Sequence, residues 1–285
     1  MTHHISLDRQ IQETIDSHVF SVRKNMLPIF TLNHGFPHYV GTGILLNLLD
    51  RHFILSAAHV LLDNSNNILI PINGDLVQID EEIKGTSIPK NKTRNEDRFD
   101  VAVLELNNST SEQIKNENLF LNLNDCLFQP LPESKNIFLL SGFPYTNVGR
   151  KSKPNKIVAE PYGYWDTNMQ ISNTDFINTK TDHRTHILIP YDRKNLFKFE
   201  TGKVTGKNLE GMSGSGIWCI SNSLIDSEMR SSQRKLAGVF IEHHSENLKL
   251  LVSTKIEVVF EMMRHFYRFE LPENNLSNLI QFESN

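Results

Sequence analysis

Three short motifs in this 285-residue chain carry side chains that could work together in acyl transfer. The run Gly211-Met212-Ser213-Gly214-Ser215 sets a serine between glycines, so the backbone can turn tightly and present the Ser213 hydroxyl. A serine hydroxyl is a poor nucleophile at neutral pH and needs a general base, which a third group must orient. The chain upstream of Ser213 must therefore supply both partners.

The predicted base is His59, at the end of Ser56-Ala57-Ala58-His59, where small residues let the chain turn sharply after an apolar strand. The predicted orienting group is Asp100, which ends a polar segment and opens the apolar run 101–106. A carboxylate at the mouth of a buried strand needs a partner. Asp97 is the rival carboxylate, and its simplest interpretation is a solvated position in the charged loop.

The elements that must position these groups are expected to be short β-strands. Runs of β-type residues recur between turn signals without helical periods between them, which is typical of antiparallel sandwiches or barrels. The expected strands are 19–22, 27–32, 39–40, a hairpin over 41–55 that turns near Asp50-Arg51, 68–72, 76–79, 101–106, 136–144, 156–159, 186–190, 196–199, 217–220 and 236–241. The polar stretch 107–135 is the expected crossing between two halves.

Helices are expected only at the two ends of the chain. Apolar residues at loosely helical spacing predict a short lead-in helix over 5–17. A stronger pattern over 254–266 predicts an amphipathic helix that covers a barrel. The expected organisation is a lead-in segment (1–18), a first β-barrel (19–122), a second β-barrel (123–253) and a C-terminal helix and tail (254–285).

Composition and charge argue against several classes of partner. The chain is 39% hydrophobic and 22% charged, which is typical of a globular protein with a substantial core. Its net charge of −4 lacks the basic excess of a protein that neutralises many phosphates, so no nucleic acid is expected. No stretch approaches the roughly 18 consecutive apolar residues of a membrane span, so no membrane partner is expected.

The cysteines and the remaining histidines predict neither disulfides nor a metal site. Cys126 and Cys219 lie far apart, and two free thiols behind a polar N-terminus favour a reducing, cytoplasmic location. The two histidines of 182–186 could share a metal only if that segment were helical, and it runs into a β-type stretch. Adjacent His243 and His244 would point to opposite faces of a strand. No metal and no cofactor are expected.

The three motifs occur in the order His, Asp, Ser, and Gly41-Thr42-Gly43 precedes the first hairpin. In this order and with these flanks they resemble the trypsin-like (chymotrypsin-fold) serine peptidases, especially the bacterial intracellular type, over about residues 19–265. The resemblance implies an all-β fold of two antiparallel β-barrels of chymotrypsin type with a C-terminal helix. The active site would lie in the cleft between the barrels.

The resemblance also implies a role for each group. His59 would take the Ser213 proton as the oxygen attacks a peptide carbonyl and then return it to the leaving amine, while Asp100 orients and stabilises the imidazole. The backbone N–H groups of Gly211 and Ser213 would form the oxyanion hole. The blander interpretation is that Ser213 caps a glycine turn and His59 is a satisfied core histidine.

Four positions depart from the secreted relatives or set specificity. Met212 replaces an aspartate that pairs with a freed N-terminus, which implies another route of activation or a site already formed in the full-length chain. Ile241 replaces a serine that helps solvate the catalytic aspartate, so another donor would have to replace it. Lys207 and His243 fall at the substrate pocket and suggest a preference for an acidic side chain, unless Lys207 points to solvent and His243 narrows the pocket.

The sequence therefore predicts a serine endopeptidase that cleaves protein or peptide substrates through an acyl-enzyme. Regulation inside the cell is expected, with an activating partner protein as one route and a defence or stress role suggested by the resemblance. The alternative is a catalytically silent peptidase-fold module that binds peptides or a partner protein in its cleft.

Overall fold

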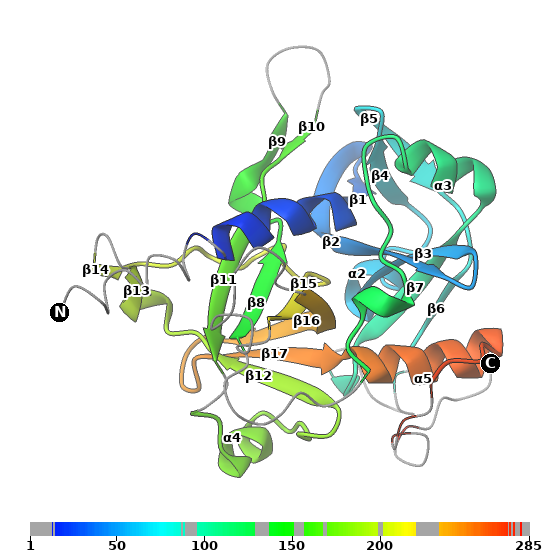
Figure 1. The fold of residues 1–285 in the computed structure, drawn as a ribbon. Helices are drawn as coiled ribbons and strands as arrows, with labels where there is room; N and C mark the ends of the chain where they lie inside the picture. Colours follow the sequence, from blue (N-terminus) through cyan, green and yellow to red (C-terminus); the bar gives the residue numbers. More distant parts are fainter. Residues whose placement is uncertain are drawn as a thin grey trace.

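Two curled antiparallel sheets and a C-terminal helix make up the fold in the computed structural model (Figure 1). The residues it describes are 13, 15–86, 88, 96–128, 137–150, 157–167, 170–198, 202–220, 234–272, 274, 276 and 280. The expected all-β fold class with two antiparallel barrels is confirmed at this level.

The first sheet has seven strands in the order β5-β4-β1-β2-β3-β7-β6. They are β1 (Met26–Asn33), β2 (Phe36–Leu48), β3 (Arg51–Ala57), β4 (Ile68–Ile72), β5 (Asp75–Ile79), β6 (Ile83–Gly85) and β7 (Val101–Leu106). Leu49 and Asp50 both have positive φ at the tip of the β2–β3 hairpin, as a tight two-residue turn requires. The hairpin predicted over 41–55 is thus confirmed, and β3 leads directly into the one-turn helix α2 (Ala58–Leu61).

The second sheet has six strands in the order β11-β8-β15-β16-β17-β12. They are β8 (Ile137–Gly142), β11 (Tyr162–Thr167), β12 (His186–Pro190), β15 (Gly216–Ile220), β16 (Arg234–His244) and β17 (Leu250–Lys255). Two small ribbons accompany it, β9 (Val148–Arg150) with β10 (Ile157–Ala159) and β13 (Leu196–Lys198) with β14 (Gly202–Val204). All of its strand pairs are antiparallel, so short connections on the sheet edges can present side chains.

Short helical pieces join these strands. They are η1 (Arg23–Asn25), α3 (Asn108–Ile114), η3 (Leu123–Asp125), η4 (Tyr145–Asn147), α4 (Asn173–Asn178) and η5 (Arg193–Asn195). The connection after α3 touches both sheets, because Leu121 bridges to Leu46 of β2 and Cys126 bridges to Leu236 of β16. This crossing therefore holds the sheets together along the backbone.

The final helix, α5 (Ile256–Tyr267), continues from β17 and reaches the first sheet. Phe260 stacks on Phe128 of the crossing, with ring centroids 4.8 Å apart. Tyr267 at its end meets Phe53 of β3 edge to face at 5.2 Å. The predicted amphipathic C-terminal helix is confirmed, starting two residues later than expected, and none of the helices described is long and apolar enough to cross a membrane.

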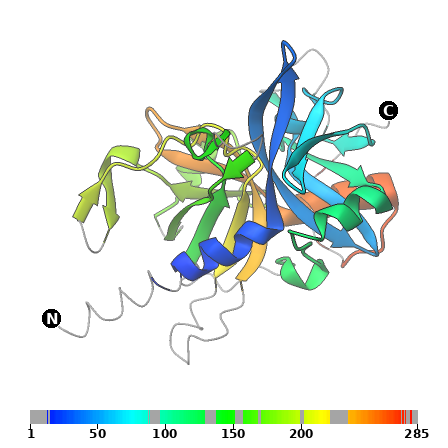
Figure 2. The same ribbon diagram turned by 90° about the horizontal axis from the view of Figure 1, so that it is seen from above.

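Part of the secondary-structure prediction was wrong. Residues 19–22 are helical, not a strand, and belong to a helix that runs from 15 to 22 and lies against β11 (Figure 2). Residues 5–12 of the expected lead-in helix lie outside the described residues. The crossing 107–135 contains helix α3, and the strands β6, β9, β11, β14 and β17 were not predicted.

Both cysteines are buried free thiols. Burial raises the pKa of Cys219 to about 12, and it raises the pKa of Cys126 as well. Neither thiol is therefore a nucleophile at neutral pH.

Candidate functional site

His59 and Asp100 are joined directly across two neighbouring strands. Antiparallel pairing of β3 with β7 sets Ala57 opposite Val101, so the residues just beyond these ends meet. The Asp100 carboxylate lies 2.6 Å from His59 Nδ1 through Oδ2, and its Oδ1 accepts from the His59 backbone N–H at 2.9 Å. Because a carboxylate only accepts, Nδ1 carries the proton of this bond, and Nε2 is the nitrogen that could take another.

The pair is buried on one side and open on the other. The Asp100 side chain is 12% exposed and the His59 side chain 35%. Asp100 adopts a left-handed backbone with φ of 45°, and its carbonyl accepts from the Ala58 N–H at 2.9 Å. A strained conformation of this kind persists only where surrounding bonds fix it.

Asp97 is not the solvated residue that the sequence suggested. It is 8% exposed, and its carboxylate accepts from the Thr86 hydroxyl at 2.6 Å and from the Phe99 N–H at 3.0 Å. The solvated interpretation was wrong because Thr86 follows strand β6, which the sequence pattern did not reveal. Asp97 thus shapes the loop ahead of Asp100.

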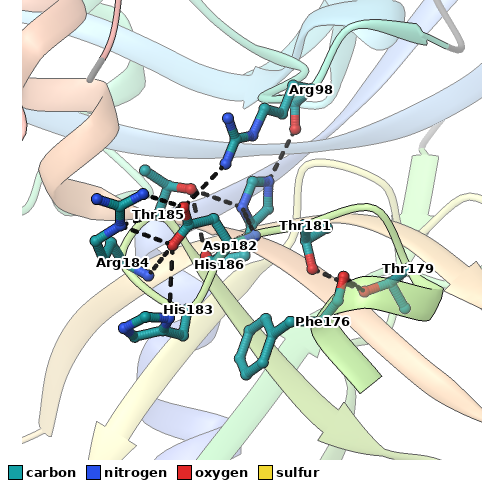
Figure 3. Close-up of polar contacts among 9 residues, drawn as sticks. All are labelled: Arg98, Phe176, Thr179, Thr181, Asp182, His183, Arg184, Thr185 and His186. Carbon is teal, nitrogen blue, oxygen red and sulfur yellow. Dashed lines mark hydrogen bonds and ion pairs between the residues drawn. The ribbon is translucent and has the colours of Figure 1, made fainter. Parts of the chain in front are cut away.

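The backbone immediately before Asp100 is held by the second sheet (Figure 3). His186 Nε2 bonds the Arg98 carbonyl at 2.8 Å, and the His186 ring stacks on Phe99 at 5.9 Å. Thr254 of β17 donates its hydroxyl to the Phe99 carbonyl at 2.6 Å. One side chain from edge strand β12 and one from its neighbour β17 therefore fix the two residues that lead into the carboxylate.

His186 is neutral in this position. The Arg98 carbonyl only accepts, so Nε2 carries the proton and Nδ1 is left to accept from the Thr185 hydroxyl, 2.9 Å away. Burial lowers the pKa of His186 to about 4. Asp182 adds an ion pair to Arg98 at 3.3 Å, and its bonds to Arg184 hold the pKa of Asp182 well below its ordinary value.

The two histidines of the segment 182–186 have different surroundings. His183 is 69% exposed and lies 3.6 Å from Asp182, whereas His186 is turned inward to Arg98. Among the described residues, no group of three or more His, Cys, Asp or Glu side chains could hold a metal ion.

The turn around Ser213 has its carbonyls engaged and two of its amides free. Each carbonyl from 209 to 213 accepts a bond: Leu209 from Met212 N, Glu210 from Tyr145 N, Gly211 from Tyr39 Oη, Met212 from Ser215 N and Ser213 from Thr42 N, at 2.7–2.9 Å. In the hydrogen bonding of the described chain, the N–H groups of Gly211 and Ser213 donate to nothing. Two neighbouring unpaired donors are what an oxyanion hole requires.

Two glycines are required for this turn. Gly211 and Gly214 have φ of 83° and 85°, the left-handed region that other residues rarely adopt. A Cβ on Gly214 would lie 2.0 Å from Ser56 Oγ and 2.1 Å from the Thr42 carbonyl. The turn is therefore pressed against the strands that lead to His59, and only glycine fits there.

A single pocket joins the two parts of the site. It has a volume of about 290 Å³ and is lined by His38, Tyr39, Val40, His59, Val60, Asn64, Tyr145, Glu210 and Gly211. The imidazole and the glycine turn thus face one space. Ser213 is partly exposed, and its hydroxyl has no hydrogen bond to His59 within the described chain.

Met212 and Ile241, the two positions that depart from the secreted relatives, are both buried. Met212 is fully buried in an apolar cluster with Leu209, Tyr191 and Phe240. Ile241 is 8% exposed and provides no polar atom to Asp100. Of the donors described around the Asp100 carboxylate, both belong to His59, so no replacement for the missing serine is found there.

Lys207 and His243 both contact Tyr191, and neither lines the pocket that holds His59. The Tyr191 hydroxyl donates to the Lys207 carbonyl at 2.8 Å, and the Tyr191 ring meets His243 at 5.2 Å. The Lys207 ammonium donates to Asn147 at the surface. Burial lowers the pKa of His243, and its Nε2 is enclosed without a hydrogen bond among the described atoms. Their predicted role in substrate binding stays a prediction.

The sequence did not single out Tyr39, Thr42, His186 or Thr254 as site residues. Thr42 lies within the Gly41-Thr42-Gly43 motif, and this was the one signal that could have drawn attention to it. The bonds from Tyr39 and His186 span 172 and 88 residues, too far for any local pattern to reveal.

No protein-family description matches this chain, and no curated protein matches it. Among solved structures, the protease Anisep from Arthrobacter nicotinovorans is similar at 13% identity and a TM-score of 0.48, covering 83% of this chain and 94% of that one. A second, from work on the intrinsically disordered Sesbania mosaic virus VPg protein, has 12% identity and a TM-score of 0.43, with coverage of 87% and 92%. Both TM-scores lie below 0.5, and both identities are 13% or less.

Proposed function

We propose that this chain is a serine endopeptidase that cleaves protein or peptide substrates through an acyl-enzyme. The observation that carries the proposal is the pocket onto which both the Asp100-paired His59 and the Gly211 turn open. A base and an oxyanion hole that face one space can act on a single carbonyl.

In this mechanism the Ser213 oxygen attacks the substrate carbonyl as His59 Nε2 removes its proton. Asp100 keeps the proton of the neutral ring on Nδ1 and stabilises the imidazolium that forms. The carbonyl oxygen takes the negative charge and receives hydrogen bonds from the Gly211 and Ser213 amides. His59 then gives the proton to the leaving amine, and water hydrolyses the ester by the same route in reverse.

Covalent labelling tests the proposal. A fluorophosphonate probe should label the wild type and leave Ser213→Ala unlabelled. Ser215→Ala is the matched control, because Ser215 lies two residues further on and is fully buried, so it should label like the wild type. Absence of wild-type labelling and of peptide hydrolysis, or equal labelling of Ser213→Ala, would overturn the proposal.

The second candidate is a peptidase fold that binds peptides or a partner protein without turnover. The observation that favours it is the Ser213 hydroxyl, which makes no hydrogen bond to His59 in the described chain. Serine–histidine bonds often tighten only when substrate binds, so this geometry is compatible with either function. Peptide binding that persists in Ser213→Ala, without cleavage by the wild type, would identify the binding module.

The proposal includes a cytoplasmic setting and regulated activity. Two buried free cysteines fit a reducing compartment. An activating partner protein remains part of the proposal, as does a role in defence or stress. Fractionation of native cells, followed by labelling of each fraction, would test the location.

A further inference from the structure

The orientation of the Gly211 peptide depends on hydrogen bonds because glycine itself does not fix it. At φ of 83° a glycine has little steric resistance to rotation of its flanking peptides. All described peptide bonds are trans, so each N–H points opposite to the carbonyl of its own peptide. Holding a carbonyl on one side of the turn therefore directs the amide of the same peptide to the other side.

Each peptide that flanks Gly211 is held by a different sheet. The Glu210 carbonyl accepts from the Tyr145 N–H at 2.8 Å, which turns the Gly211 N–H the opposite way. The Gly211 carbonyl, which belongs to the next peptide, accepts from the Tyr39 hydroxyl at 2.7 Å, and the Met212 N–H of that peptide donates to the Leu209 carbonyl at 2.9 Å. The Tyr39 bond therefore limits rotation about the Gly211 Cα and acts on the Gly211 N–H through that atom. Tyr145 follows β8 of the second sheet, whereas Tyr39 lies in β2 of the first. The second restraint therefore crosses from one sheet to the other.

The Tyr39 hydroxyl is committed to donating. It also contacts the Phe143 carbonyl, so its one hydrogen is shared between two carbonyls that can only accept, those of Gly211 and Phe143. Thr42 Oγ1 lies 3.3 Å away and itself accepts from the Phe143 N–H at 3.1 Å. Since the tyrosine hydrogen goes to a carbonyl, the hydrogen between the two hydroxyls must come from Thr42. Burial raises the pKa of Tyr39, so the hydroxyl stays protonated at any working pH.

We propose that Tyr39 is a positioning residue for the oxyanion hole, which acts through the Gly211 carbonyl from the opposite sheet. The inference rests on the proposed function. Its ring packs against Gly211, since a Cβ there would lie 2.5 Å from Tyr39 Cε1, and the ring contacts Phe30 edge to face at 5.5 Å. The ring is thus held by packing, and the hydroxyl supplies the directed bond.

The test is Tyr39→Phe, which removes the hydroxyl and keeps the ring. Loss of an oxyanion donor costs about 10²–10³ in kcat, and loss of a restraint on the peptide next to that donor should cost less, about tenfold. KM should change by less than about twofold, since the ground-state substrate makes little use of the hole. Affinity for a peptide boronate, whose tetrahedral adduct occupies the hole, should fall by the same factor as kcat/KM.

The matched control is Tyr164→Phe. The half-buried Tyr164 hydroxyl also contacts a backbone carbonyl, that of Pro190 at 2.7 Å, and the Asp166 carboxylate at 2.9 Å, and none of these is in the turn. It should lose a comparable amount of stability and keep wild-type kcat. An unchanged kcat in Tyr39→Phe, a rise in KM alone, or an equal loss of kcat in Tyr164→Phe would each overturn the inference.

Crystal structures of the wild type and Tyr39→Phe decide the inference without any substrate. The peptide that carries the Gly211 carbonyl should rotate or become mixed in orientation in the variant. An unchanged peptide would overturn the inference even if the enzyme is active. A wild type that neither hydrolyses peptides nor labels would end the proposed function instead, and the two failures are therefore distinguishable.

Discussion

The site has a proposed acid–base half, His59 with Asp100, and a proposed oxyanion half, the Ser213 turn, and each half is held by bonds from the opposite sheet. His59 and Asp100 belong to the first sheet, and the residues ahead of Asp100 are bonded by His186 and Thr254 of the second. The Ser213 turn belongs to the second sheet, and it is bonded by Tyr39 and Thr42 of the first. Each sheet therefore orients the chemical groups of the other.

The groups that support Asp100 and those that support the Ser213 turn differ in whether they can change charge. The acid–base half depends on a buried imidazole, and burial lowers the pKa of His186 only to about 4. The oxyanion half depends on the Tyr39 hydroxyl and the Thr42 backbone N–H, both of them neutral, and burial raises the pKa of Tyr39. Mild acid should therefore weaken the support of Asp100 while it leaves the Ser213 turn unaffected.

The largest effect is expected from Asp100→Asn, which breaks the acid–base half. The amide cannot stabilise an imidazolium and favours the wrong tautomer of His59, so kcat should fall by about 10⁴. The rate of fluorophosphonate labelling measures this loss. Asp97→Asn is the control, because it changes a neighbouring buried carboxylate that bonds Thr86 instead of His59. Equal losses in both variants would contradict the assigned role of Asp100.

Gly214→Ala should disrupt the Ser213 turn, and with it the oxyanion half, by lowering the stability of the fold. A left-handed alanine costs about 1–3 kcal/mol, and the contacts with Ser56 and Thr42 add about 1–3 kcal/mol of overpacking. The urea midpoint should fall accordingly. Gly149→Ala is the control, since a Cβ there meets nothing within 4 Å and φ is not in the left-handed region. A wild-type midpoint for Gly214→Ala would show that the turn is not packed as described.

His186→Gln should sharpen the contrast in pH sensitivity. The folded pKa of His186 is lowered from the ordinary 6.5 to about 4, so the unfolded chain binds the extra proton first. The contribution to stability is full above about pH 6.5 and is lost as pH falls toward 4, by at most about 3 kcal/mol.

Glutamine keeps a donor for the Arg98 carbonyl but does not titrate. Urea unfolding at pH 7, 6, 5 and 4 should therefore show a shallower fall in stability for His186→Gln than for the wild type. Parallel curves would mean that His186 is not the group that titrates.

The smallest effect is expected from Lys207→Gln. This variant tests whether substrate specificity depends on a residue outside both halves of the site. With a lowered pKa His243 is neutral at pH 7, so any preference for an acidic side chain before the cleaved bond depends on Lys207. Lys207→Gln should reduce that preference about fivefold, on the order of 1 kcal/mol for an exposed ion pair. Peptide-library cleavage measures it, with the exposed Lys203→Gln as control. No difference between the two variants would remove Lys207 from the substrate site.

The sequence was enough to pair His59 with Asp100, but it did not reveal the residues whose bonds hold them. His59 and Asp100 follow and precede apolar strands whose pairing is local enough to infer, and the structure brings the two side chains together. Whether Ser213 completes a triad with them is not tested by this geometry, and it stays a prediction. Tyr39 and His186 were invisible because their bonds depend on how two separate sheets meet.

The errors in the prediction have a physical reason too. The run 19–22 is apolar and β-branched, but its burial follows a helical period: Ile15 and Val22 are buried, whereas Phe20 is 73% exposed. A short apolar run does not distinguish helix from strand by composition alone. Asp97 was taken as solvated because charged neighbours surround it in sequence, although its partner Thr86 arrives from another strand.

The burial of Met212 has a consequence for how the activity of the proposed enzyme could be regulated. A thioether buried among Leu209, Tyr191 and Phe240 fills the space beneath Ser213 with the chain's own apolar atoms. No freed chain terminus is needed to fill that space, so the turn takes its shape once the two sheets have come together. If the proposed function holds, activation need not supply a buried group behind Ser213, and control of the enzyme is expected to act on what reaches the pocket.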